Sequence, residues 1–255
     1  WQYSTDGTNW INIDSPYASV TYSGAITSYQ VRALNGTNTV AFTSKPSGTI
    51  KNVGVYAFVI NNPNNTYANP TLSFEILPVE LIWQYSTDNG NTWLNLTENT
   101  IDYTGLTYKI RAWDGTSAVA LSTQPSTAIK DANTYSFVAN NAGGAYSNET
   151  LDFKINVLRL SVEWQFKGAA TDARGNYFWN YDGNAHAPVA VLKGLSNEQA
   201  GNMPLGYAFT LRGASAGIDP LNIKDAGAYG VTVELLDASG NTLNDPNIIL
   251  SGASA

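Results

Sequence analysis

One seven-residue motif occurs three times in the 255-residue chain, at intervals the size of a small domain. Its pattern is Ile-Lys-[Asn/Asp]-[Val/Ala]-[Gly/Asn]-x-Tyr, and the copies occupy residues 50–56, 129–135 and 223–229. A motif that returns at such intervals is typical of a tandem array, in which each copy marks the same place in one structural unit. Chain length alone would favour one or two domains. The motif instead predicts three.

Other landmarks recur in the same order and set the boundaries between units. A Trp-Gln-aromatic sequence begins at Trp1, Trp83 and Trp164, and a Tyr-x-Gly sequence follows at 22–24, 103–105 and 181–183. These registers divide the chain into repeat 1 (1–78), repeat 2 (79–157) and repeat 3 (158–255). The junctions are apolar and lack the glycine and serine of flexible linkers, so we expect semi-rigid joints and an elongated molecule.

Each repeat has the sequence pattern of β-strands. Residues 29–33 and 108–112 alternate polar and apolar side chains, which is typical of half-buried strands. Turn sequences at 6–9 and 88–91 predict hairpins. No stretch combines helical periodicity with caps, so we expect no helix. Repeat 3 carries extra residues around 194–220, where we expect a longer loop or hairpin.

The last residue of the motif is interpreted as a structural tyrosine. In immunoglobulin-like sandwiches, a tyrosine near the start of a late strand turns its hydroxyl back to the upstream backbone and forms a tyrosine corner. Residues 225–231 match the Asp-x-Gly-x-Tyr-x-Cys sequence that carries this corner, with Val231 at the cysteine position. The predicted corner residues are Tyr56, Tyr135 and Tyr229, and the first two are followed by Phe58 and Phe137 at that position. A ligand-contact role is the alternative, but the spacing to an inward apolar residue favours the corner.

The expected fold is therefore all-β, an elongated tandem array of three immunoglobulin-like β-sandwich domains. The chain contains no cysteine, so the predicted sandwiches have apolar packing in place of an inter-sheet disulfide. Units of about 80 residues can bury enough apolar surface to fold without a disulfide.

Repeat 3 resembles the Ig-like repeats of large bacterial surface proteins and adhesins, the group called MBG or YDG domains. Residues 181–188 (Tyr-Asp-Gly-Asn-Ala-His-Ala-Pro) look like the opening segment of that family, and residues 225–229 look like its closing Asp-Ala-Gly-x-Tyr segment. Repeats 1 and 2 depart from it, because they lack the His-x-Pro continuation. The resemblance implies a β-sandwich module in a long, secreted, surface-attached chain that serves as a stalk or adhesive segment. It implies no shared catalytic residues.

Charge and hydropathy exclude several classes of partner. The net charge is −7 and only 13% of residues are charged. We expect neither nucleic acid nor an anionic membrane surface as a partner, because both require clustered Lys and Arg. No apolar run approaches the roughly 20 residues that span a bilayer, so direct membrane insertion is not expected. Because the chain begins at Trp1 inside a repeat pattern, we expect it to be a segment of a longer extracellular protein.

The sequence offers little chemistry for catalysis or metal binding. His186 is the only histidine, which excludes a two-histidine metal site, and we interpret it as a turn or strand-start residue. Residues 88–91 and 182–184 faintly resemble calcium loops, but their acidic ligands are few and turn chemistry explains them better. No pair of carboxylates of the kind that glycosidases use is evident. We therefore predict no enzyme activity, no catalytic, cofactor-binding or metal residues and no cofactor, with calcium as a weak alternative.

The abundant aromatic residues could form a glycan-binding face. Trp1, Trp83 and Trp164 recur in register, which favours packing within each repeat. Trp113 lies outside that register and is the one weak candidate for a ligand contact.

Three functional hypotheses follow. The first is a non-enzymatic stalk or adhesive segment of a bacterial surface protein, with a host, cell-surface or glycan ligand. The second is a structural unit of a self-assembling surface layer or filament, whose partners are copies of itself. The third is a glycan-binding module.

Overall fold

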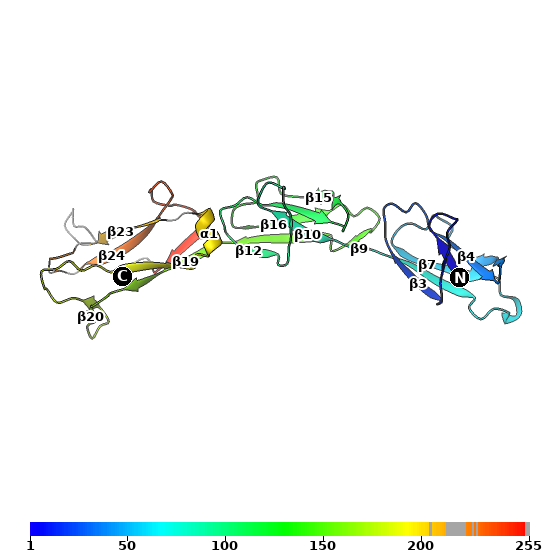
Figure 1. The fold of residues 1–255 in the computed structure, drawn as a ribbon, viewed down its shortest axis with the longest axis horizontal. Helices are drawn as coiled ribbons and strands as arrows, with labels where there is room; N and C mark the ends of the chain where they lie inside the picture. The colour runs from blue at the N-terminus through cyan, green and yellow to red at the C-terminus, as the bar shows by residue number, and fades with distance from the viewer. Residues whose placement is uncertain (204–205, 213–222, 226, 228, 253–255) are drawn as a thin grey trace.

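The chain is extended, and its sheets form three groups that follow one another along the long axis (Figure 1). This computed structural model describes residues 1–203, 206–212, 223–225, 227 and 229–252. Strands account for 47% of the structure and helices for 3%, so the protein is all-β. Among the described residues, no helix has the length and apolar character needed to cross a bilayer.

The elements are as follows. Repeat 1 contains β1 (Gln2–Ser4), β2 (Ile11–Asn12), β3 (Tyr17–Thr21), β4 (Gln30–Asn35), β5 (Asn38–Val40), β6 (Phe42–Ser44), β7 (Gly54–Ile60), the 3₁₀ helix η1 (Pro63–Asn65) and β8 (Thr71–Leu77). Repeat 2 contains β9 (Val79–Glu80), β10 (Ile82–Ser86), β11 (Leu94–Asn95), β12 (Thr100–Asp102), β13 (Lys109–Trp113), β14 (Ala118–Val119), β15 (Leu121–Thr123), β16 (Asn133–Ala139), β17 (Tyr146–Ser147) and β18 (Thr150–Asn156). Repeat 3 contains β19 (Leu158–Gln165), β20 (Ala170–Thr171), β21 (Tyr177–Phe178), β22 (Val189–Lys193), α1 (Asn197–Asn202), β23 (Gly206–Arg212), β24 (Gly230–Leu236) and β25 (Ile248–Ser251).

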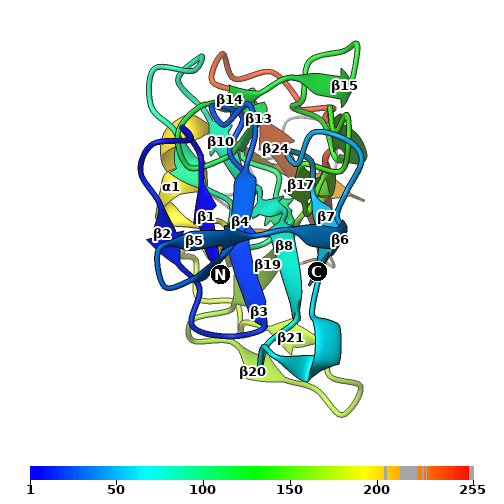
Figure 2. The same ribbon diagram turned by 90° about the vertical axis from the view of Figure 1, so that its right-hand side faces the viewer.

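Repeat 1 has two four-stranded sheets, in the orders β2-β1-β4-β5 and β3-β8-β7-β6. Seen along the long axis, β1 and β2 lie on one side and β6, β7 and β8 on the other (Figure 2). The chain passes from one sheet to the other between β5 and β6, at Ala41. The strand β8 alternates polar and apolar residues, and its apolar side chains are the centre of the core: Leu72, Phe74 and Ile76 are each at most 2% exposed.

Repeat 2 repeats this arrangement. Its four-stranded sheets have the orders β11-β10-β13-β14 and β12-β18-β16-β15. The strand β18 has the place of β8, because it pairs antiparallel with β16 and parallel with β12. Its side chains Leu151, Phe153 and Ile155 are buried like their counterparts in β8. An additional parallel pair joins β9 to β17.

Repeat 3 shares only part of this arrangement. The pair β19–β22 corresponds to β1–β4 and β10–β13, and β25 lies parallel to the first half of β19 as β17 lies parallel to β9. Among the described residues, β24 forms a sheet with β23 alone. Two further strands, β20 and β21, form a small hairpin.

The expectation that the chain has no helix is wrong at residues 197–202. Ser196 caps α1 and accepts a hydrogen bond from the backbone N–H of Gln199, while the Gln199 side chain accepts one from the backbone N–H of Ser196. This capping box satisfies the free amides of the first turn, so a helix forms even though it is short. The helix lies in the segment 194–220 that was predicted as a longer loop or hairpin. The same segment contains β23, which pairs with β24. Residues 204–205 and 213–222 lie outside the described residues.

Corresponding contacts recur in all three repeats. An isolated β-bridge joins Tyr29 to Ile50, Tyr108 to Ile129 and His186 to Ile223. The indole N–H of the leading tryptophan donates to a backbone carbonyl near the end of each repeat. The pairs are Trp1 with Asn69 at 3.1 Å, Trp83 with Asn148 at 3.0 Å, and Trp164 with Gly252 at 2.8 Å. These contacts place the three repeats in one structural register.

One apolar core is confined to a single repeat, and the other extends across a repeat boundary. One cluster is confined to repeat 1 and is centred on Phe74. A second, larger cluster contains Phe153 of repeat 2 together with Met203 and Leu235 of repeat 3. Repeats 2 and 3 therefore share a core across their junction.

Candidate binding cleft

A hollow of about 930 Å³ in repeat 3 is lined by aromatic side chains. Its lining comes from residues 175–188, from Ile223, Lys224, Asp225, Gly227, Tyr229 and Val231, and from the end of β19. Its aromatic lining includes Trp164, Phe166, Tyr177, Trp179, Tyr181 and Tyr229. Of these, Tyr177 and Tyr181 are 54% and 75% exposed. Apolar surface of this kind is unusual outside binding sites and interfaces.

The aromatic rings of the cleft are held by stacking on one another. Phe166 lies against Tyr177 with ring centroids 4.1 Å apart and an interplanar angle of 9°. Trp179 stacks on His186 at 5.5 Å and 16°. The hairpin formed by β20 and β21 brings Tyr177 to the end of β19, where Phe166 follows the strand.

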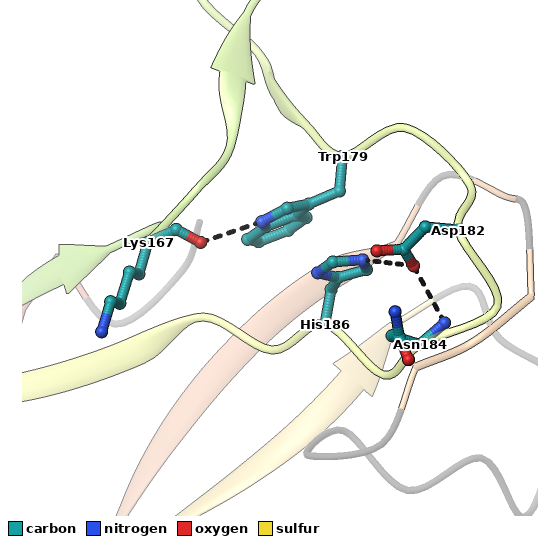
Figure 3. A network of polar contacts seen from close by, with 5 residues as sticks. All are labelled: Lys167, Trp179, Asp182, Asn184 and His186. Atoms are coloured by element: carbon teal, nitrogen blue, oxygen red, sulfur yellow. Dashed lines mark hydrogen bonds and ion pairs between the residues drawn. The ribbon is translucent and has the colours of Figure 1, made fainter.

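A polar network fixes the second stacked pair (Figure 3). The indole N–H of Trp179 donates to the backbone carbonyl of Lys167 at 3.0 Å. The Nε2 atom of His186 lies 3.0 Å from Asp182 Oδ1, and the same oxygen accepts the backbone N–H of Asn184 at 2.9 Å. The hydrogen bonds from Asn184, and then the one with His186, lower the pKa of Asp182 to about 2. The carboxylate therefore stays charged at neutral pH and holds His186 in place.

The sequence interpretation of His186 as a turn or strand-start residue omits part of its role. Its backbone forms the bridge to Ile223, as expected at the start of a strand. Its ring also lines the cleft, at the position that Tyr29 and Tyr108 occupy in the other repeats. Those two tyrosines are buried, at 5% and 6% exposure.

Of the other residues predicted from the sequence, Tyr229 lines the cleft, while Tyr56, Tyr135 and Trp113 lie outside it. In each repeat the motif tyrosine donates to the carbonyl four residues upstream: Tyr56 to Asn52 at 2.8 Å, Tyr135 to Asp131 at 3.0 Å and Tyr229 to Asp225 at 3.1 Å. Trp113 is half-buried on β13, where the guanidinium of Arg111 lies 4.6 Å from its ring and 4.2 Å from that of Trp93. Its ligand role stays a prediction.

The loops that faintly resemble calcium sites use their carboxylates in turns. Asp88 accepts hydrogen bonds from the backbone of Asn91 and Thr92, and from the side chain of Thr92. These bonds, the one from the Thr92 side chain first, hold the pKa of Asp88 well below its usual value. No group of three His, Asp or Glu side chains suitable for a metal ion occurs among the described residues.

The sequence contained a signal for the cleft that residue-by-residue reasoning missed. Tyr177, Phe178 and Trp179 are consecutive. Side chains alternate between the two faces of a strand, so on a strand with one buried face such a run would expose at least one aromatic ring to solvent. Comparison with family models, with curated proteins and with solved structures finds no match to the chain.

Proposed function

We propose that this chain is a non-enzymatic stalk or adhesive segment of an extracellular bacterial surface protein, built from three immunoglobulin-like domains joined end to end. The observation that carries this proposal is the construction of the joints. Repeats 2 and 3 meet through a shared apolar core and side-chain hydrogen bonds. The segment that connects repeats 1 and 2 is paired along the backbone of repeat 2, so neither joint is a free linker, as a spacer requires.

The joint between repeats 2 and 3 has the most contacts. The hydroxyl of Tyr103 donates to Asp245 Oδ2 at 3.0 Å, and the side chain of Gln199 donates to the backbone carbonyl of Tyr103 at 3.1 Å. Asn247 accepts the backbone N–H of Ala132 at 2.7 Å. Since Tyr103, Gln199 and Asn247 are each less than 9% exposed, these bonds are shielded from water and resist exchange with it.

Close approach at this joint requires a glycine. Gly105 has a φ of +74°, and a Cβ atom there would lie 2.8 Å from Cγ of Met203. A residue with a side chain would be strained at that φ, and the Met203 side chain would have to move to make room for it. The segment that distinguishes repeat 3 from the other repeats thus supports the junction.

The joint between repeats 1 and 2 is built differently. The backbone N–H groups of Val79 and Leu81 donate to the carbonyls of Ala145 and Ser147, at 3.0 and 3.1 Å. These bonds tie the connecting segment to repeat 2 rather than leaving it as a free linker. The rings of Tyr22 and Tyr146 meet edge to face at 6.4 Å across the junction.

The proposal includes the division into three domains and the structural role of the motif tyrosines. The recurring bridges, indole bonds and tyrosine bonds support three units with boundaries near residues 78 and 157. The carboxylates of Asp88 and Asp182 are engaged in their own turns, which supports a non-enzymatic role.

Small-angle X-ray scattering of the purified chain tests the spacer role. We expect a monomeric particle with the elongated profile of Figure 1, unchanged over a wide concentration range. A compact or flexibly hinged particle would contradict the proposal. Growth in particle mass with concentration would instead favour the self-assembling layer or filament.

A glycan-binding module is the second candidate, because aromatic rings line the cleft of repeat 3 and sugar rings stack on such surfaces. A glycan array probed with the chain and with the Trp179→Ala variant tests it. Hits that the variant loses would support glycan binding. An array without hits would argue against it.

A further inference from the structure

We infer that the cleft of repeat 3 is a docking groove for a peptide β-strand with the Leu-x-Phe-x-Ile pattern of β8 and β18. This inference goes beyond the spacer role and does not depend on it. It follows from comparing the three repeats at corresponding positions.

The cleft lies where the other repeats have a strand. In repeat 2, β18 is placed between β16 and β12, and in repeat 1, β8 is placed between β7 and β3. The cleft of repeat 3 likewise lies between Gly227, Tyr229 and Val231, at the start of β24, and residues 175–182, which lead into the third Tyr-x-Gly. Among the described residues, no strand fills this place.

Several residues that line the cleft correspond to residues that contact that strand in the other repeats. In repeat 2, Ile155, Phe153 and Leu151 lie opposite Asn133, Tyr135 and Phe137. The corresponding residues of repeat 3 are Gly227, Tyr229 and Val231, and all three line the cleft. Because side chains alternate along a strand, this register directs the three apolar residues of an incoming strand into the groove.

The central phenylalanine has a preformed place. Phe74 of β8 packs between Tyr3 and Tyr29, with ring centroids at 5.5 and 5.4 Å. The counterparts of these tyrosines in repeat 3 are Phe166 and His186, and both line the cleft. An incoming phenylalanine would therefore complete an aromatic cluster like that of repeat 1.

Two features beside the cleft differ from their counterparts in repeats 1 and 2, where a strand lies at this position. The backbone N–H groups of Tyr22 and Tyr103 donate to the carbonyls of Leu77 and Asn156, at the ends of β8 and β18. Their counterpart Tyr181 is 75% exposed. In addition, β7 and β16 begin at the motif positions Gly54 and Asn133, whereas β24 begins at Gly230, three positions further along the aligned motif.

The test uses the full chain and a synthetic peptide with the sequence of β18, Thr-Leu-Asp-Phe-Lys-Ile-Asn. We expect saturable one-to-one binding by titration calorimetry, and slower hydrogen exchange at residues 229–231. In a control peptide, the three apolar residues are each moved by one position, so that they point to solvent instead of into the groove. We expect this peptide to bind about tenfold more weakly.

Two variants of the chain locate the site. We expect Phe166→Ala to weaken binding about tenfold, because it removes one aromatic contact to the incoming phenylalanine. Val189→Ala is the matched control, since Val189 is 49% exposed and lies outside the cleft lining, and it should bind as the parent chain does.

A fusion keeps the inference testable if the free peptide is too short to bind. The β18 sequence appended after Ala255 supplies the strand at high effective concentration. We expect the fusion to unfold at a higher temperature than the parent, and the position-shifted sequence to have no such effect. Failure of both the free peptide and the fusion would overturn the inference, as would equal binding of the shifted peptide. A chain dimer that the peptide does not dissociate would also overturn it, because the groove would then accept a second copy.

Discussion

At the scale of single residues, the hydroxyls of the motif tyrosines connect a loop to a strand by hydrogen bonds to the backbone four residues upstream. Tyr135 is 6% exposed, and its hydroxyl donates to the carbonyl of Asp131. This bond spans four residues, so the local sequence is enough to form it. Its energetic value depends on burial, because water cannot replace a bond inside the core.

The variant Tyr135→Phe removes that hydroxyl and keeps the ring. We expect it to lower the free energy of unfolding by about 1 kcal/mol, because the carbonyl of Asp131 loses this donor and the N–H of Asp131 loses this acceptor. Chemical denaturation monitored by tryptophan fluorescence measures the change. Tyr181→Phe is the control, since Tyr181 is 75% exposed and the change should be close to zero. Equal stability of the Tyr135 variant and the parent would refute the corner interpretation.

Tyr103 gives the joint between repeats 2 and 3 a dependence on alkaline pH. Burial, followed by the hydrogen bond to Asp245, raises the pKa of Tyr103 from 10 to about 12. Because the folded-state pKa lies above the unfolded value, the stabilisation is complete below pH 10 and is lost as pH rises toward 12. We expect the unfolding temperature to fall over this window more steeply in the parent than in Tyr103→Phe. Parallel curves for the two proteins would contradict this role.

At the scale of elements, α1 shows how a short helix can matter through its docking. It has six residues, too few to be stable alone. Its capping box organises the first turn, and Gln199 then reaches the backbone of Tyr103 in the neighbouring repeat. The helix is therefore stabilised by the joint that it supports.

Replacing Gln199 by Ala should loosen this joint. The change removes a buried hydrogen bond and half of the capping box, and leaves the carbonyl of Tyr103 without that donor. We expect a loss of about 1–3 kcal/mol in unfolding free energy. Asn197→Ala, at an exposed position of the same helix, is the matched control. If Gln199→Ala and Asn197→Ala have the same stability, the helix does not secure the joint.

At the scale of the whole molecule, the two apolar clusters predict how the chain unfolds. One cluster is limited to repeat 1, while the other continues from repeat 2 into repeat 3. Residues that share a core tend to unfold together. Repeats 2 and 3 should therefore behave as one cooperative unit, and repeat 1 as another.

Differential scanning calorimetry should accordingly resolve two transitions. Phe74→Ala and Phe153→Ala each remove a fully buried ring, at a cost of about 3–5 kcal/mol. We expect Phe74→Ala to lower only the transition of repeat 1, and Phe153→Ala to lower only the shared transition of repeats 2 and 3. A single transition that both variants lower equally would contradict the division.

Much of the fold could be predicted because it depends on short-range patterns. The alternation in β7, β8, β16 and β18 predicts strands, and the recurring motif places the three repeats in one register. The helix α1 was missed because its signal is the brief Ser196-x-x-Gln199 pattern, without a long apolar period. The cleft was missed because its lining combines residues far apart in the chain, such as Phe166 and Tyr229.

The sequence by itself determined the all-β class, the repeat registers and the tyrosines that bond four residues upstream. Each of these depends on alternation or on contacts within a few residues, which the order of side chains specifies directly. Only the tertiary structure decided that repeats 2 and 3 share a core, that Gln199 docks on Tyr103, and that the start of β24 borders a cleft. Those features depend on which distant segments come into contact. Burial stabilises such contacts only once the intervening chain has folded and the entropy of closing the long loops has been lost.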